Sequence, residues 1–64
     1  MSVLGIGGCD SFGNDAKLIV ERGQEGASFR ILIFGEKGVE YDISMRIDVE
    51  GVKKLIKFLS GVVE

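Results

Sequence analysis

The stretch "GVEYDISMRID", residues 38–48, decides the fold, because its apolar and polar side chains alternate along its whole length. Period-two alternation over ten residues predicts a β-strand with one buried face. The preceding stretch "SFRILIFG", residues 28–35, carries apolar side chains at both odd and even positions and predicts a neighbouring strand. The alternating apolar positions of the first stretch are Val39, Tyr41, Ile43, Met45 and Ile47.

The turn "GEKG", residues 35–38, fixes how these two strands pair. A two-residue loop would place Ile33 opposite Glu40, which sets an apolar side chain against an acid on one face. A three-residue loop that includes Gly38 instead pairs Ile33 with Tyr41. Its third position requires a left-handed backbone, where glycine has no steric penalty. We therefore expect the second register, which also pairs Ile31 with Ile43 and Phe29 with Met45.

The segment before these strands predicts a third strand and a turn. "AKLIVER", residues 16–22, alternates in the same way, and "GQEG", residues 23–26, is typical of a turn. These elements form an antiparallel meander. "SVLGI", residues 2–6, would add a short fourth strand, although glycine is a poor strand residue.

The hydrophobic period changes to that of a helix after Asp48. Asp48 suits the N-cap position, where its carboxylate accepts a hydrogen bond from the N–H of Glu50 or Gly51. Gly61 suits the left-handed position that ends a helix. The apolar residues at helical spacing are Val49, Val52, Leu55, Ile56, Leu59, Val62 and Val63.

The sequence therefore predicts one small α+β domain over residues 1–64. Residues 1–15 form a glycine-rich N-terminal segment, residues 16–48 a meander of three or four antiparallel strands, and residues 49–61 one amphipathic helix. The helix is expected to pack on one face of the sheet. That face is formed by Ile31, Ile33, Tyr41, Ile43 and Met45.

The small size of the chain limits how it can be stabilised. A domain of about 60 residues buries only about 60% of its unfolded surface. Cys9 is the single cysteine and there is no histidine, so neither an internal disulfide nor a metal site is expected. We expect self-association instead, unless the N-terminal segment covers the second sheet face. The residues that one helix cannot cover, and that we assign to an interface, are Ile19, Leu32, Phe34 and Phe58.

Charge and hydropathy exclude several classes of partner. The net charge is −2 and the pI is near 5.0, which is atypical of a nucleic-acid-binding domain. No apolar run approaches the ~20 residues that cross a membrane. The unpaired Cys9 favours a reducing cytoplasm.

The glycine-rich run between residues 5 and 15 is the candidate ligand site. It matches neither the dinucleotide fingerprint nor the phosphate-binding P-loop. Its glycines could aim backbone N–H groups at one anion, while its polar side chains bind hydroxyls or phosphate. Ordinary turn chemistry in "FGND" is the alternative interpretation. The candidate ligand-binding residues are Gly7, Gly8, Cys9, Asp10, Ser11 and Asn14.

Two functions follow, and both are non-catalytic and need no cofactor. The first is a homo-oligomeric binding module that recognises and occupies a partner protein. The second is a protein that sequesters an anionic, nucleotide-like molecule through the glycine-rich segment at a subunit interface. A third, a low-activity enzyme using Asp10 or Cys9, has less support because histidine is absent. In scale alone, the chain is similar to small accessory proteins of bacteria, archaea, phages and other mobile elements.

Overall fold

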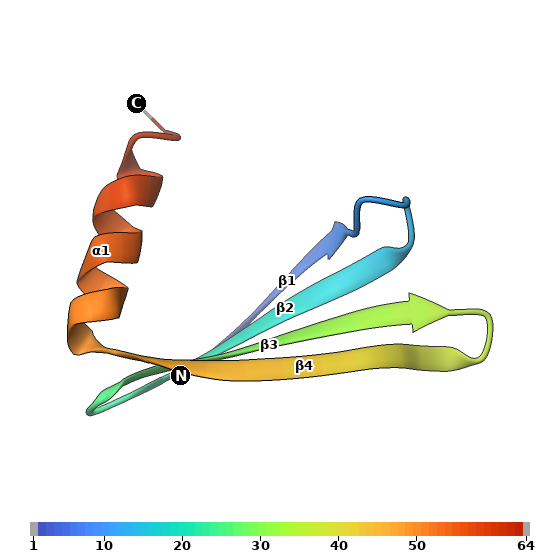
Figure 1. Ribbon diagram of the computed structural model, residues 1–64, viewed down its shortest axis with the longest axis horizontal. Coiled ribbons are helices and arrows are strands. Elements are labelled where there is room, and N and C mark those ends of the chain that lie inside the picture. The colour runs from blue at the N-terminus through green and yellow to red at the C-terminus, as the bar shows by residue number, and fades with distance from the viewer. Residues whose placement is uncertain (1, 64) are drawn as a thin grey trace.

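A computed structural model describes residues 2–63 as an α+β fold with a four-stranded antiparallel sheet and one C-terminal helix (Figure 1). The strands follow the order β1-β2-β3-β4, so each strand pairs with its neighbour in sequence. No helix within residues 2–63 has the length and apolar character needed to cross a membrane. The elements are β1 (Val3–Cys9), β2 (Asp15–Gly23), β3 (Gly26–Gly35), β4 (Gly38–Asp48) and α1 (Val49–Ser60).

The expected pairing of β3 with β4 is confirmed. Ile33 lies opposite Tyr41, and Gly38 has a φ of 108°, which glycine adopts without strain. The additional residue of β4 was expected in the loop, but the structure places it within the strand pair. Gly35 pairs directly with Gly38, and the register shifts between Ile33 and Phe34, so the strand takes up the additional residue beside the loop. This irregularity lets the apolar side chains of both strands share one face.

The glycine-rich start of the chain forms a longer strand than "SVLGI" predicts. β1 continues through Gly7 and Gly8, which pair with Lys17 and Ala16 of β2. Pairing along the whole of β2 overrides the weak strand propensity of glycine, because each residue is held by the ladder rather than by its own preference. The fourth strand is therefore part of the sheet.

The start of α1 agrees with the prediction and its end does not. The Asp48 carboxylate accepts a hydrogen bond of 2.8 Å from the N–H of Gly51, as an N-cap does. Gly61 was expected to be left-handed but has a φ of −69°, so that expectation is wrong. Instead, tight bonds from Gly61 to Phe58 and from Val62 to Leu59 close the last turn. Such i to i−3 bonds satisfy terminal carbonyls without a left-handed residue.

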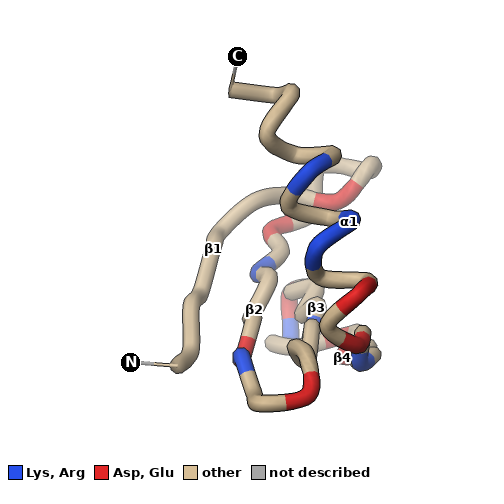
Figure 2. Tube along the Cα trace, turned by 90° about the vertical axis from the view of Figure 1, so that its left-hand side faces the viewer, with Lys and Arg blue, Asp and Glu red and all other residues tan. Residues whose placement is uncertain are grey.

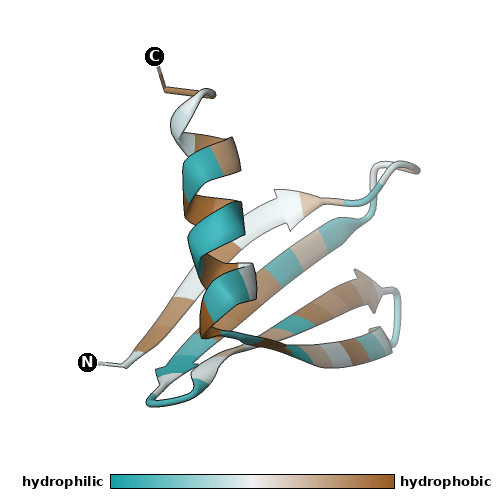
Figure 3. Ribbon diagram, turned by 60° about the vertical axis from the view of Figure 1, so that its left-hand side comes forward, coloured by the Kyte–Doolittle hydropathy of each residue, from teal (hydrophilic) through white to brown (hydrophobic). Residues whose placement is uncertain are grey.

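The side chains of the sheet separate into two faces with different chemistry. Hydrophobic and hydrophilic residues alternate along β4 (Figure 3). The hydrophobic side chains of the sheet lie on the side of α1, and we call this side the apolar face. The opposite face carries charged residues, including an ion pair between Arg30 and Asp42. The apolar face comprises Leu4, Ile6, Leu18, Val20, Phe29, Ile31, Ile33, Tyr41, Ile43 and Met45.

The helix lies on the expected side of the sheet but covers little of it. α1 contacts β3 and β4 near the strand–helix junction and then rises away from the sheet (Figure 1). Met45 stays 62% exposed and Ile43 59% exposed. No side chain among residues 2–63 is fully buried. The expected cover of the apolar face is thus limited to one end of it.

Candidate functional site

The predicted ligand residues lie at the end of β1 and in the turn that follows. Gly7 and Gly8 belong to the strand, where successive N–H groups point in opposite directions. They therefore do not converge on one centre, and the expected anion nest is not formed. Cys9 ends the strand and is exposed, with a free thiol. The turn residues of the predicted site are Asp10, Ser11 and Asn14.

Asp10 holds this turn together. Its carboxylate accepts hydrogen bonds from the N–H of Phe12 at 2.9 Å and from the N–H of Asn14 at 2.8 Å. The side-chain amide of Asn14 donates to the second carboxylate oxygen at 3.1 Å. These donors, the Asn14 amide foremost, lower the pKa of Asp10 below its ordinary value. Two of the three polar turn residues predicted to bind a ligand, Asp10 and Asn14, thus bind each other.

The remaining features of this region offer limited chemistry. A shallow hollow of about 280 Å³ lies beside Gly7, Gly8 and Cys9, with Lys17 at its wall. Within residues 2–63, no group of three His, Cys, Asp or Glu side chains is arranged to hold a metal ion. β1 itself carries no charged residue, as its uniform tan tube shows (Figure 2). The hollow therefore has one cationic group, from the neighbouring strand.

A second hollow, of about 590 Å³, lies at the turn between β2 and β3. Its charged side chains are Glu25, Arg46 and Asp48. Asp48 already caps the helix, and the two acids oppose binding of an anion beside Arg46. This hollow has no predicted ligand residue in its wall.

The four predicted interface residues do not form one patch. Ile19, Leu32 and Phe34 point to the polar side of the sheet, since each alternates with a residue of the apolar face. All three are half-buried. Phe58 lies on α1 on the other side of the sheet and is 77% exposed. The structure therefore separates Phe58 from the other three.

The Arg30–Asp42 ion pair occupies the centre of the polar side. The Arg30 Nε donates to one Asp42 carboxylate oxygen at 2.8 Å, and its Nη2 donates to the other. The hydrogen bond from Arg30 lowers the pKa of Asp42, and Asp42 raises the pKa of Arg30. Bidentate pairing is the strongest geometry for these two groups. The ion pair lies beside the apolar side chains Ile19 and Leu32 on this side of the sheet.

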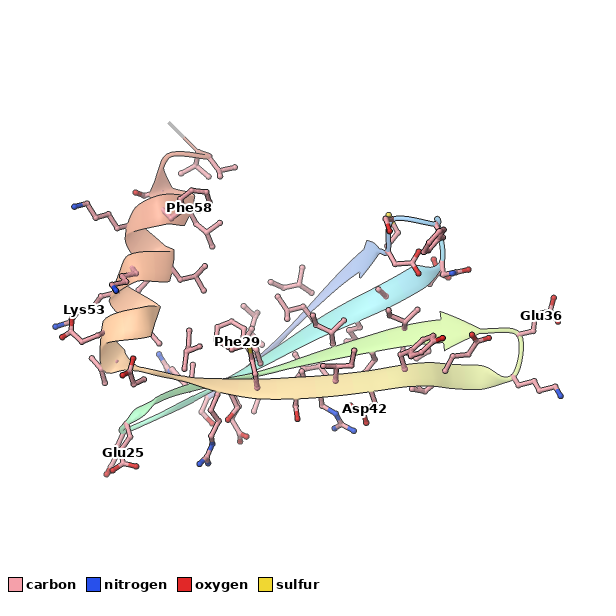
Figure 4. All side chains as sticks on the ribbon, in the orientation of Figure 1. Glu25, Phe29, Glu36, Asp42, Lys53 and Phe58 are labelled. Atoms are coloured by element: carbon pink, nitrogen blue, oxygen red, sulfur yellow. The ribbon has the colours of Figure 1, made fainter. Side chains whose placement is uncertain are left out.

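The largest apolar feature is a groove of about 560 Å³ between α1 and the apolar face. Phe29 rises from the sheet into the space below the helix, and Phe58 points from the helix toward the sheet side (Figure 4). Lys53 points to the opposite side of the helix (Figure 4). The side chains that line the groove include Leu18, Phe29, Ile31, Ile43, Met45, Ile47, Lys54, Leu55 and Phe58.

The chemistry of this groove is that of a contact surface. Lys54 is the one charged side chain in its lining, Ser44 adds a single hydroxyl group, and no acid lines it. An apolar surface that stays open to water is typical of a protein-binding site. Sequence analysis placed Ile31, Ile43 and Met45 in a core under the helix rather than in a groove. The short length of the chain already indicated an open surface, since one helix of 12 residues covers only part of a four-stranded sheet.

No protein-family model, curated protein or solved structure matches this chain significantly.

Proposed function

We propose that the chain is a non-catalytic binding module, a small homo-oligomer that recognises and occupies a partner protein. The observation that carries this proposal is the open groove between α1 and the apolar face, together with the absence of any fully buried side chain among residues 2–63. A folded domain normally closes such a surface, because apolar burial is its main source of stability. A second protein surface supplies the missing burial.

The polar side of the sheet is the part of the molecule that stays available to a partner protein. It presents Ile19 and Leu32 between charged groups such as Lys17 and the Arg30–Asp42 pair. Apolar side chains ringed by polar ones are typical of a protein-binding surface whose centre excludes water. The two sides of the sheet thus suit different contacts, self-association on one and a partner on the other.

The small-ligand alternative has weaker support. The Asp10 carboxylate and the Asn14 amide are engaged with each other in the turn, and the glycines of β1 are extended. An anion would have Lys17 as its charged contact, from the hollow beside β1. We therefore place sequestration of a nucleotide-like anion second. The exposed, unpaired Cys9 suits work in the reducing cytoplasm.

Native mass spectrometry of the protein purified from its own host tests both functions. A homo-oligomer that retains a second polypeptide supports the proposed function. An oligomer that retains a small molecule, with excess absorbance near 260 nm, supports sequestration, because the chain has no tryptophan and a single tyrosine. A monomer of 6.9 kDa without any bound molecule contradicts both.

A further inference from the structure

The accessible surface of the chain is larger than a compact monomer of its size exposes. The surface is 5579 Å², whereas a compact 6.9 kDa protein exposes about 4,000 Å². The radius of gyration is 13.3 Å, whereas about 10.7 Å is expected for a compact chain of this length. The excess of about 1,600 Å² is surface that folding within one chain leaves uncovered.

The junction between β4 and α1 prevents the helix from closing this surface within its own chain. β4 ends at Asp48 and α1 begins at Val49, so no linker joins them. The Asp48 cap fixes the first turn of the helix through Gly51. The direction in which α1 leaves the sheet is therefore set by the strand, and a hinge that would let the helix swing down is lacking between these two elements.

The helix and the apolar face leave matching surfaces uncovered. On α1, Ile56 is 64% exposed and Leu59 is also exposed. On the sheet, Leu4 and Ile6 of β1 and Tyr41 and Ile43 of β4 are exposed. A helix of 12 residues is about 18 Å long, and four strands span about 14 Å between the outer strand axes. One helix therefore has the length to lie across the sheet of another copy.

Charge favours a second copy of this chain as the occupant. The ten residues of the apolar face are uncharged, and the charged side chains that adjoin it are Arg22 of β2, Glu40 of β4, which lies against Gly35, and Lys54 of α1. The ten apolar side chains of two copies can meet without like-charge repulsion between them, even though each chain carries a net charge of −2. Of the lysines of α1, Lys53 points away from the sheet side (Figure 4), whereas Lys54 lines the groove beside the apolar face.

We propose that two copies form a two-fold dimer in which the apolar side of each α1 lies against the apolar face of the other copy. Two-fold symmetry makes the contact reciprocal, so each chain gives one helix and receives one. If each copy covers its excess surface, the dimer buries about 3,200 Å², within the range of obligate homodimers. This inference rests on the homo-oligomer of the proposed function and names its interface.

An isotope-filtered NOE experiment on a 1:1 mixture of labelled and unlabelled protein tests the contact directly, with the mass measured by light scattering on the same sample. We expect a dimer with NOEs between chains that connect the Ile56 or Leu59 methyl groups to Ile6 or Ile43. A dimer whose NOEs between chains lie elsewhere overturns this interface and leaves the proposed function standing. A folded monomer overturns both.

A charge-swap pair tests the reciprocity. Ile56→Glu on the helix and Ile43→Lys on the sheet should each weaken the dimer by roughly a hundredfold or more, because each places an unpaired charge in the interface. Mixing the two variants should restore a dimer, since one native contact and one Glu–Lys contact then form. The matched controls are Phe12→Glu, in the β1–β2 turn, and Leu32→Glu, on the polar side, and both should keep the dimer.

The outcomes of the charge-swap experiment are distinct even if a single variant unfolds. Recovery of a folded heterodimer on mixing supports the reciprocal contact. Failure to recover overturns it, as does a dimer that Leu32→Glu disrupts while Ile56→Glu leaves it intact. If Leu32→Glu alone disrupts the dimer, the polar side of the sheet is the interface, and the proposal of a homo-oligomer is retained.

Discussion

The β1–β2 turn makes hydrogen bonds among its own polar groups, whereas the groove beneath α1 leaves its apolar side chains unburied. In the turn, Asp10 accepts from Phe12 and Asn14, so the polar groups of the glycine-rich segment are used within it. In the groove, the side chains of the sheet and the helix face each other across open space. The glycine-rich segment, which the sequence marks as a ligand site, uses the Asp10 carboxylate for hydrogen bonds within its own turn. The sheet face, which the sequence marks as a core, leaves its apolar side chains exposed.

This difference separates what the chain satisfies within itself from what it leaves exposed. Hydrogen bonds in a short turn are made between neighbours in sequence, so they form whatever the rest of the protein does. Apolar burial needs surfaces that are distant in sequence or belong to another chain. The groove is therefore the part of the molecule that we propose a second copy closes.

The two phenylalanines of these regions give the largest expected contrast. If a second copy completes the burial of Phe29, as we propose, Phe29→Ala should lower the free energy of unfolding by about 3 kcal/mol or more, as for a buried aromatic side chain. Phe12→Ala in the turn should change it by about 0.5 kcal/mol or less, since Phe12 is 87% exposed. Urea unfolding at one fixed protein concentration measures both. If Phe29→Ala changes the free energy of unfolding as little as Phe12→Ala does, Phe29 is not buried by a second copy.

Two glycines sharpen the contrast at the level of the backbone. Gly26 has a φ of 144°, and a Cβ there would collide with the carbonyl oxygen of Ile47 at the strand–helix junction. Gly38 has a φ of 108° but has open space around it. Gly26→Ala should therefore cost about 2–3 kcal/mol and Gly38→Ala about 1 kcal/mol, the cost of backbone strain alone. If thermal unfolding shows a smaller loss of stability for Gly26→Ala than for Gly38→Ala, the backbone at the strand–helix junction can shift to admit the Cβ.

Loss of the Asp10 side chain should lower the stability of the protein rather than its binding of an anion. Asp10→Ala removes the acceptor for three hydrogen bonds and should lower the melting temperature. Ser11→Ala is the matched control, in the same exposed turn, and should change it less. Differential scanning calorimetry of both variants measures the effect. An unchanged melting temperature for Asp10→Ala, with loss of a bound anion, would instead support the ligand site.

Acid should weaken the protein through Asp10 and Asp42. The folded-state pKa of each lies below the ordinary value of 3.8, so the ionised forms are favoured by folding. Their contribution is complete at pH values above the unfolded pKa and is lost as the pH falls through the lowered folded-state pKa. Unfolding midpoints from about pH 7 to about pH 3 should therefore stay level and then decline. Asp10→Asn and Asp42→Asn should each make the decline shallower, and an unchanged decline would contradict these roles.

The parts of the fold that depend on near neighbours could be predicted from the sequence. Gly38 and the alternation from Tyr41 to Ile47 set the β3–β4 register, whereas Val39 lies beyond the register shift, opposite Phe34, and Asp48 sets the start of α1. These features depend on local backbone preference and on side chains a few residues apart. The structure confirms them for that reason.

The remaining features depend on the whole molecule. Gly7 and Gly8 join a strand because β2 holds them, and Gly61 stays right-handed because the last turn tightens instead. The angle at which α1 leaves the sheet has no local signature, since it follows from the lack of a linker after Asp48. The groove could therefore not be placed from hydrophobic periodicity, which marks an apolar face without telling what covers it.

The dependence of thermal stability on protein concentration tests the central claim most directly. If a second copy closes the groove, folding and association are coupled, and each tenfold dilution should lower the free energy of unfolding by about 1.4 kcal/mol. Circular dichroism melts over a hundredfold range of concentration, with the mass followed by light scattering, should show a melting temperature that falls on dilution and a dimer of twice 6.9 kDa. A constant melting temperature with a folded 6.9 kDa monomer at every concentration would contradict the account.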